Sequence, residues 1–126
     1  MKQISSFVLD KEDDKAVQLF AELGMPKNLA KTLMYISQVD ECRSAEIEQG
    51  ADLRQPEVSL AMQELRQRGW VAKQDLKGKG KGRPIHIYKA TKPLSQVMEE
   101  IEQEKTKEIE AIKDNMLELK NIFNNR

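Results

Sequence analysis

Residues 44–71 read SAEIEQGADLRQPEVSLAMQELRQRGWV, and this is the most informative stretch of the chain. Ser44 is typical of a helix N-cap and Gly50 of a helix end, so we expect a short helix over residues 45–49. The segment after Gly50 holds one large apolar side chain, Leu53, which predicts a tight turn with that leucine buried. The stretch therefore begins as a short helix and a turn.

A second helix is expected from about Pro56, because proline suits the first helical position, to Gly69. Its apolar residues recur at i, i+3, i+4 and i+7 and are Val58, Ala61, Met62 and Leu65. On or near the other face lie Gln55, Glu57, Ser59, Leu60 and Gln63. One face can seat the helix while the other is free to hydrogen-bond base edges, the division that a recognition helix in the major groove needs.

The flanking segments predict two more helices and a β-hairpin. An apolar pattern capped near Asp10 predicts a helix that ends at Gly24, and Pro26 opens another that runs to about Gln38. Extended stretches are expected from Trp70 and over residues 85–88. Glycines and a proline between the strands predict a long basic loop, whose charged residues are Lys77, Lys79, Lys81 and Arg83.

The segment from Pro93 to about Asn124 predicts one long helix, because no glycine or further proline interrupts it. Its apolar residues are Met98, Ile101, Ile109, Ile112, Met116, Leu119 and Phe123. If Lys105 fills the gap in this stripe, the spacing is that of heptads interrupted once by an extra residue. The helix would be about 45 Å long, which is far more than the core of the preceding domain can cover, so the apolar stripe needs a partner. A second copy of the chain is the expected partner, and folding back onto its own domain is the alternative.

This order of elements resembles the winged helix-turn-helix regulators of the TrmB-like and MarR-like families. The resemblance covers residues 26–92 and is carried by the stretch quoted above, with the junction Arg68-Gly69-Trp70-Val71. It implies a mainly α fold with a small β-hairpin (α+β). Residues 1–92 would form the DNA-binding domain and residues 93–126 the dimerisation helix. We expect no counterpart of the large sugar-binding effector domain that TrmB-like proteins carry.

The expected function is sequence-specific binding of double-stranded DNA by a homodimeric transcriptional regulator. The glutamines at 55 and 63 can pair with adenine, and Ser59 can reach a base or a phosphate. The expected backbone contacts are Ser44 and Arg54, the latter with guanine as a second possible target. Glu57 can accept from cytosine or favour the helix N-terminus, and Leu60 can meet a thymine methyl group or pack on a neighbouring element. The four basic loop residues would add affinity without sequence information.

Charge is segregated along the chain although the 126 residues sum to zero net charge. Residues 1–65 carry a net charge of −5, residues 66–92 of +8 and residues 93–126 of −3. A basic segment between acidic ones suits one face meeting a polyanion.

The remaining sequence features exclude some functions and kinds of site and assign none. Cys42, the single cysteine, cannot form an internal disulfide, and we expect a structural residue rather than a redox sensor. His86, the single histidine, is expected at the surface rather than on a metal. With no catalytic assembly, cofactor motif, signal peptide or membrane span, we expect a cytoplasmic protein that is not an enzyme. The alternative function is a winged-helix module that docks to other proteins in a larger assembly.

Overall fold

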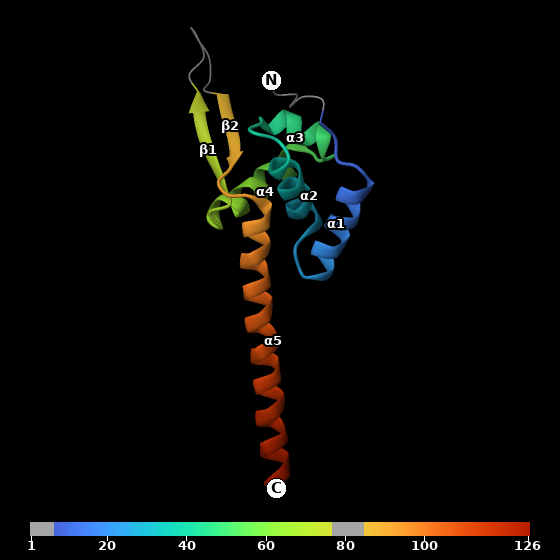
Figure 1. Ribbon diagram of the computed structural model, residues 1–126, viewed down its shortest axis with the longest axis vertical. Coiled ribbons are helices and arrows are strands. Elements are labelled where there is room, and N and C mark those ends of the chain that lie inside the picture. Colours follow the sequence, from blue (N-terminus) through green and yellow to red (C-terminus); the bar gives the residue numbers. More distant parts are fainter. Residues whose placement is uncertain (1–6, 77–84) are drawn as a thin grey trace. The chain divides into compact units, whose positions relative to one another are not determined.

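The computed structural model describes residues 7–76 and 85–126, and the chain divides into two compact units, residues 1–92 and 93–126. The elements, labelled in Figure 1, are α1 (Lys11–Glu22), α2 (Lys27–Ser37), α3 (Ser44–Gly50), α4 (Gln55–Gln67), β1 (Val71–Leu76), β2 (Ile85–Ala90) and α5 (Leu94–Asn124). The predicted order of helices, hairpin and long helix is confirmed.

Helix α1 begins and ends where its sequence predicts. The backbone N–H of Asp10 donates to Asp13 Oδ2 (2.8 Å), and the backbone N–H of Asp13 donates to Asp10 Oδ1 (3.0 Å). This reciprocal pair satisfies donors that the first helical turn leaves without partners. At the other end Gly24 has a φ of 101°, a conformation that glycine adopts without the strain of a side chain.

The predicted N-cap of α3 is wrong by one residue. Arg43 has the extended backbone of an N-cap, and its N–H donates to Glu46 Oε1 (2.7 Å). Ser44 is the first helical residue, and its hydroxyl donates to Glu48 Oε2 (3.1 Å). The glutamate three residues on therefore satisfies the helix start, a role that the serine does not fill.

The turn and the apolar face of α4 form as predicted. Leu53 is buried, and its backbone N–H donates to the carbonyl of Glu48 (3.0 Å). The buried residues of α4 are Val58, Ala61, Met62 and Leu65. Around them the first unit buries its largest side chains, which include Trp70, Tyr35, Leu33, Ile36 and Ile47. This core fixes which face of α4 is left to solvent.

The hairpin pairs β1 and β2 in antiparallel register, with Val71 opposite Ala90 and Leu76 opposite Ile85. A bridge that the sequence did not predict adds the segment before α3 to this hairpin. The N–H of Cys42 donates to the carbonyl of Tyr88 (2.9 Å), and the N–H of Tyr88 donates to the carbonyl of Cys42 (2.8 Å). Two backbone hydrogen bonds thus hold β2 to the chain that leads into α3.

The second unit is the single helix α5, 31 residues long, which confirms the predicted long helix. At 1.5 Å per residue it measures about 46 Å. Within the described ranges, no helix combines the length and apolar character that spanning a membrane requires.

Candidate nucleic-acid interface

Three polar side chains form a row along the solvent face of α4. Gln55, Ser59 and Gln63 are all exposed and follow one another at intervals of four residues. Since each residue of an α-helix rises 1.5 Å, the row is about 12 Å long. That length corresponds to three or four steps of about 3.4 Å along one DNA strand. The predicted recognition residues are therefore on one accessible face.

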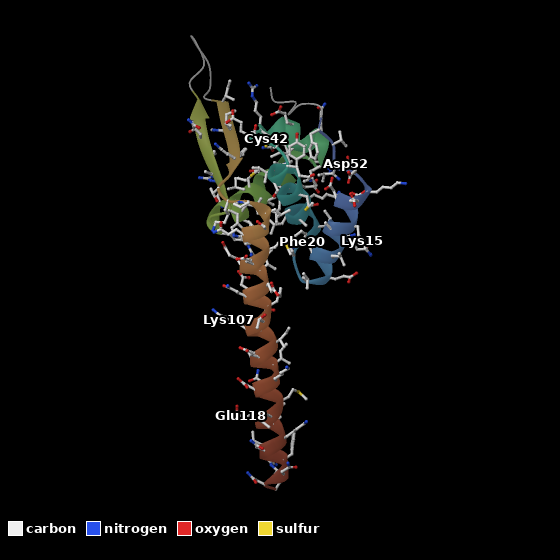
Figure 2. The ribbon with its side chains drawn as sticks, viewed as in Figure 1. Lys15, Phe20, Cys42, Asp52, Lys107 and Glu118 are labelled. Atoms are coloured by element: carbon white, nitrogen blue, oxygen red, sulfur yellow. The ribbon has the colours of Figure 1, made fainter. Side chains whose placement is uncertain are left out.

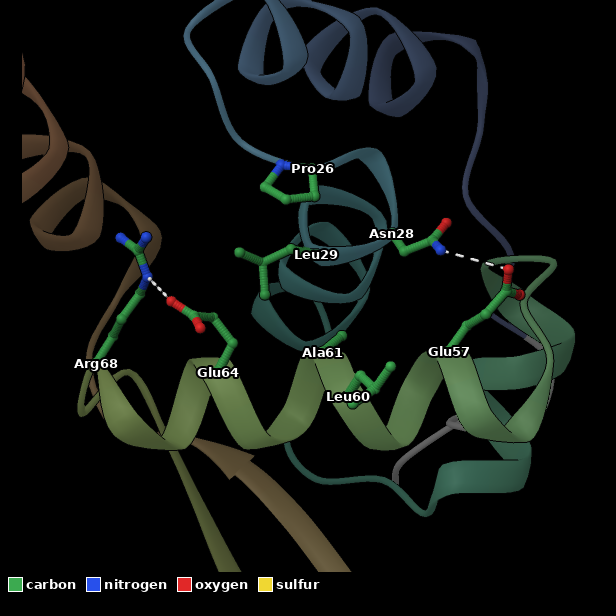
Figure 3. A pocket seen from close by; sticks show the side chains of 8 residues that line it. All are labelled: Pro26, Asn28, Leu29, Glu57, Leu60, Ala61, Glu64 and Arg68. Atoms are coloured by element: carbon green, nitrogen blue, oxygen red, sulfur yellow. Dashed lines mark hydrogen bonds and ion pairs between the residues drawn. The ribbon is translucent and has the colours of Figure 1, made fainter.

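Arg54 and Glu57 meet at the start of α4. The exposed Arg54 is the N-cap, and its backbone N–H donates to Glu57 Oε1 (2.8 Å). The other oxygen of Glu57 accepts from Asn28 Nδ2 (3.3 Å), so this half-buried carboxylate is turned toward α2 (Figure 3). Of its two predicted roles, the position of Glu57 fits the one at the helix N-terminus better than contact with cytosine.

Leu60 lies on the solvent side of α4 and is 69% exposed. It borders a groove between α2 and α4 whose apolar lining includes Pro26, Leu29 and Ala61 (Figure 3). The alternative that Leu60 packs closely on a neighbouring element is not what the structure shows. The groove could not be predicted from the sequence, because its two sides are about thirty residues apart in the chain.

The end of α4 holds an ion pair beside the buried tryptophan. Arg68 Nε donates to Glu64 Oε2 at 2.9 Å, and the Arg68 guanidinium lies 5.0 Å from the centroid of the Trp70 ring. The spacing of four residues between glutamate and arginine is the sequence signal that could have revealed this pair. Arg66, also absent from the predicted interface, is exposed near the same end.

The expected basic tip of the hairpin, which carries Lys77, Lys79, Lys81 and Arg83, lies outside the described residues. On the described strands His86 Nδ1 lies 2.6 Å from Asp75 Oδ1, with both side chains about half exposed. The hydrogen bond from His86 lowers the pKa of the Asp75 carboxyl below its usual range. His86 is at the surface as predicted, and no group of three metal-ligating side chains occurs in the part of the chain that the structure describes.

Cys42 is a core residue. It is 1% exposed, and burial together with the nearby glutamates Glu46 and Glu41 raises the pKa of its thiol to about 12. Since the thiolate is the reactive form, this environment suppresses thiol chemistry. The structure thus favours the structural role expected from the sequence over a redox sensor.

The apolar stripe of α5 is largely exposed. Its exposed members are Met98, Ile109, Ile112, Met116, Leu119 and Phe123, and Leu117 and Ile122 add to the apolar surface. Side chains around Lys107 and Glu118 are visible along this helix in Figure 2. Ile101 differs from the rest because it is buried, and Lys105 Nζ lies 3.3 Å from Glu108 Oε1. The uncovered stripe thus runs mainly from Ile109 onward.

Three solved structures resemble this chain in fold. TrmBL2, described as an archaeal chromatin protein with a novel mode of DNA binding, aligns with a TM-score of 0.56 and 20% identity over 85% of this chain. The chain spans only 41% of the length of TrmBL2. NMB1585, a MarR family regulator from Neisseria meningitidis, aligns with a TM-score of 0.50 and 18% identity, covering 90% of this chain and 89% of its own.

NadR, solved in complex with 4-hydroxyphenylacetate, aligns with a TM-score of 0.52 and 17% identity, covering 87% of this chain and 79% of its own. No family model and no curated protein matches the sequence. These neighbours are described as a chromatin protein and a regulator rather than as enzymes. Similarity at this level of identity concerns the fold, and by its fold the chain is a winged helix-turn-helix protein.

Proposed function

We propose that this protein binds double-stranded DNA through α4 and acts as a homodimeric transcriptional regulator. The observation that carries the proposal is the exposed row Gln55, Ser59 and Gln63. Their side chains form no hydrogen bonds within the described residues, and they are exposed beside the apolar face that seats the helix. Amide and hydroxyl groups presented in this way match the donors and acceptors of base edges in the major groove.

Positive charge accompanies this row. Arg54 is exposed at the N-cap of α4 and Arg66 on the helix itself, and Lys73 and Lys89 are exposed on the strands of the hairpin. These cations, with the basic residues of the hairpin tip, supply the phosphate contacts that give affinity and hold a protein in register on the duplex. We assign Glu57 to the cap of α4, since both of its oxygens already accept hydrogen bonds there.

The known neighbours support the same function. A regulator of the MarR family and a chromatin protein with its own mode of DNA binding share this fold. Dimerisation is proposed from the exposed stripe of α5. Two copies joined by that stripe would read two half-sites, which requires a pseudo-palindromic sequence.

Selection of duplexes from a random pool by the full chain tests sequence reading. We expect enrichment of one sequence, and we expect Gln63→Ala to reduce the preference for it over random duplex by about 1–3 kcal/mol, the value of a lost base contact. Gln18→Ala, which removes an exposed glutamine on α1, is the matched control and should leave the preference unchanged. Failure to enrich any sequence, or an equal loss on selected and random DNA, would contradict the role given to α4.

A further inference from the structure

The groove between α2 and α4 has the size and lining of a small-molecule site. Its volume is about 380 Å³, and its apolar lining comes from Pro26, Leu29, Leu60 and Ala61 (Figure 3). Small-molecule pockets typically measure about 300–1,000 Å³ and combine apolar walls with a few polar groups. Leu60 contributes to this lining while remaining 69% exposed, so an apolar ligand would remove its surface from water.

Charge at the groove favours a cation. Two carboxylates line it, those of Glu57 and Glu64, against the single guanidinium of Arg68. Arg68 is already engaged, because it pairs with Glu64 at 2.9 Å and stands over the ring of Trp70. One negative charge is left without a cationic counterpart in the groove.

That charge is on Glu57. Within the described residues its oxygens accept only from neutral donors, the side-chain amide of Asn28 at 3.3 Å and the backbone N–H of Arg54 at 2.8 Å. A carboxylate has about four acceptor positions, so capacity remains for a further donor. Because Glu57 is half-buried, a charge-assisted hydrogen bond to it is screened less than one at the open surface.

We propose that this groove binds a small organic cation, an amine with an aromatic or branched aliphatic body. The ammonium group donates to Glu57, and the body lies on Leu29, Leu60 and Ala61. A carboxylate ligand of the same shape meets the like charge of Glu57 and is rejected. This effect rests on the proposed function: the amine also alters DNA binding, because Leu60 and Glu57 belong to α4, the helix that carries Gln55, Ser59 and Gln63.

Binding is measured first without DNA, on the full chain. The probes are phenethylamine and hydrocinnamate, which pair similar aromatic bodies with opposite charges. Trp70 is the single tryptophan, and Arg68 connects its ring to the groove, so its fluorescence is one readout and amide shifts of α4 in NMR spectra are the other. We expect saturable binding of the amine, and binding of hydrocinnamate at least about tenfold weaker.

Two variants locate the site. Glu57→Gln should weaken amine binding about tenfold, and because glutamine also serves at this position of a helix cap, α4 is kept. Glu22→Gln, an exposed glutamate at the end of α1 outside the groove, should bind like the parent protein. Equal affinity for the two probes, unchanged binding by Glu57→Gln, or no saturable binding in the millimolar range would each overturn the proposal.

A duplex titration separates this inference from the proposed function. With both correct, phenethylamine raises the apparent Kd for DNA in the parent protein and does so less in Glu57→Gln. Amine binding by a protein that does not bind duplex DNA would leave the groove assigned and remove the DNA function. DNA binding by a protein that does not bind the amine would do the reverse.

Discussion

Gly50 lies in α3 against the ring of Tyr35, where a side chain has no room. An added Cβ would lie 2.6 Å from the carbonyl oxygen of Phe7 and 2.8 Å from Cδ2 of Tyr35. Replacing a helical glycine by alanine ordinarily stabilises a protein by about 1 kcal/mol, because alanine has the higher helix propensity. Here the overlap with a buried ring and a backbone atom reverses the sign.

We therefore expect Gly50→Ala to lower the free energy of unfolding by about 1–3 kcal/mol, the usual range for overpacking. Urea denaturation followed by circular dichroism measures it. The neighbouring Gln49→Ala, on the exposed side of α3, should leave stability unchanged or raise it slightly. A gain in stability from Gly50→Ala would show that Tyr35 and Phe7 move aside easily.

A second residue-scale prediction concerns the pair Asp75 and His86 across the hairpin. Since the hydrogen bond from His86 lowers the pKa of Asp75, His86→Ala should raise that pKa toward its ordinary value of 3.8. A lowered carboxyl pKa adds stability above the unfolded-state pKa, and that contribution is lost as the pH falls through the folded-state pKa. In His86→Ala this contribution of Asp75 to the stability should be smaller. NMR titration of the Asp75 side-chain carboxyl in the parent protein and in the variant measures the shift.

The site could be predicted only in part at this scale. Ser59 and Gln63 are exposed, as expected for residues outside the apolar positions of α4, because helical periodicity alone decides that. The orientation of Glu57 was not predictable, since its partner Asn28 is 29 residues away and no local pattern joins them. The cap of α3 was misplaced by one residue, because two signals compete there. Ser44 is itself typical of an N-cap, whereas Glu46 as the third helical residue places the N-cap at Arg43.

The helices and strands have a repeating sequence pattern and were predicted, whereas the bridge between Cys42 and Tyr88 has none and was missed. The helices follow from apolar spacing bounded by glycine and proline, and β1 and β2 from extended stretches on either side of a loop. The bridge between Cys42 and Tyr88 involves one residue on each side, so it has no period to detect. Only the packed core brings those two backbones together.

The element-scale prediction concerns the basic tip of the hairpin. Replacing Lys79 and Lys81 by alanine should reduce the slope of log affinity against log salt by up to about 1.8, that is, about 0.9 for each lost phosphate contact. Fluorescence anisotropy on random duplex at several salt concentrations measures the slope. Lys11→Ala/Lys15→Ala removes the same charge from exposed positions on α1 and should keep the parent slope. An unchanged slope in the tip variant would mean that these lysines do not contact phosphate.

At the scale of the whole molecule, the exposed stripe of α5 leads to the prediction of a dimer. Ile112 is 60% exposed and lies between Ile109 and Met116 on the stripe. If two copies pair through it, Ile112→Asp places two carboxylates in an apolar seam, at a cost of several kcal/mol that a short coiled coil cannot absorb. We expect that variant to sediment as a monomer at micromolar concentration and the parent protein as a dimer.

The matched control is Ala111→Asp, which adds the same charge to an exposed position beside the stripe and should leave the dimer intact. The monomeric variant should also lose affinity for a two-half-site duplex far beyond its loss on a single half-site, since linked reading heads bind with a high effective concentration. A parent protein that sediments at 14.5 kDa would contradict both the dimer and the palindromic site.

The burial of the single cysteine makes the protein convenient for labelling. Because the Cys42 thiol is enclosed and its pKa is about 12, thiol reagents react with it only when the core opens. A second cysteine placed on an exposed position of α4 or the hairpin can then carry a dye or spin label while the native residue is retained. The rate at which Cys42 itself becomes modified reports how often the segment before α3 separates from β2, so the folded chain contains its own probe of opening.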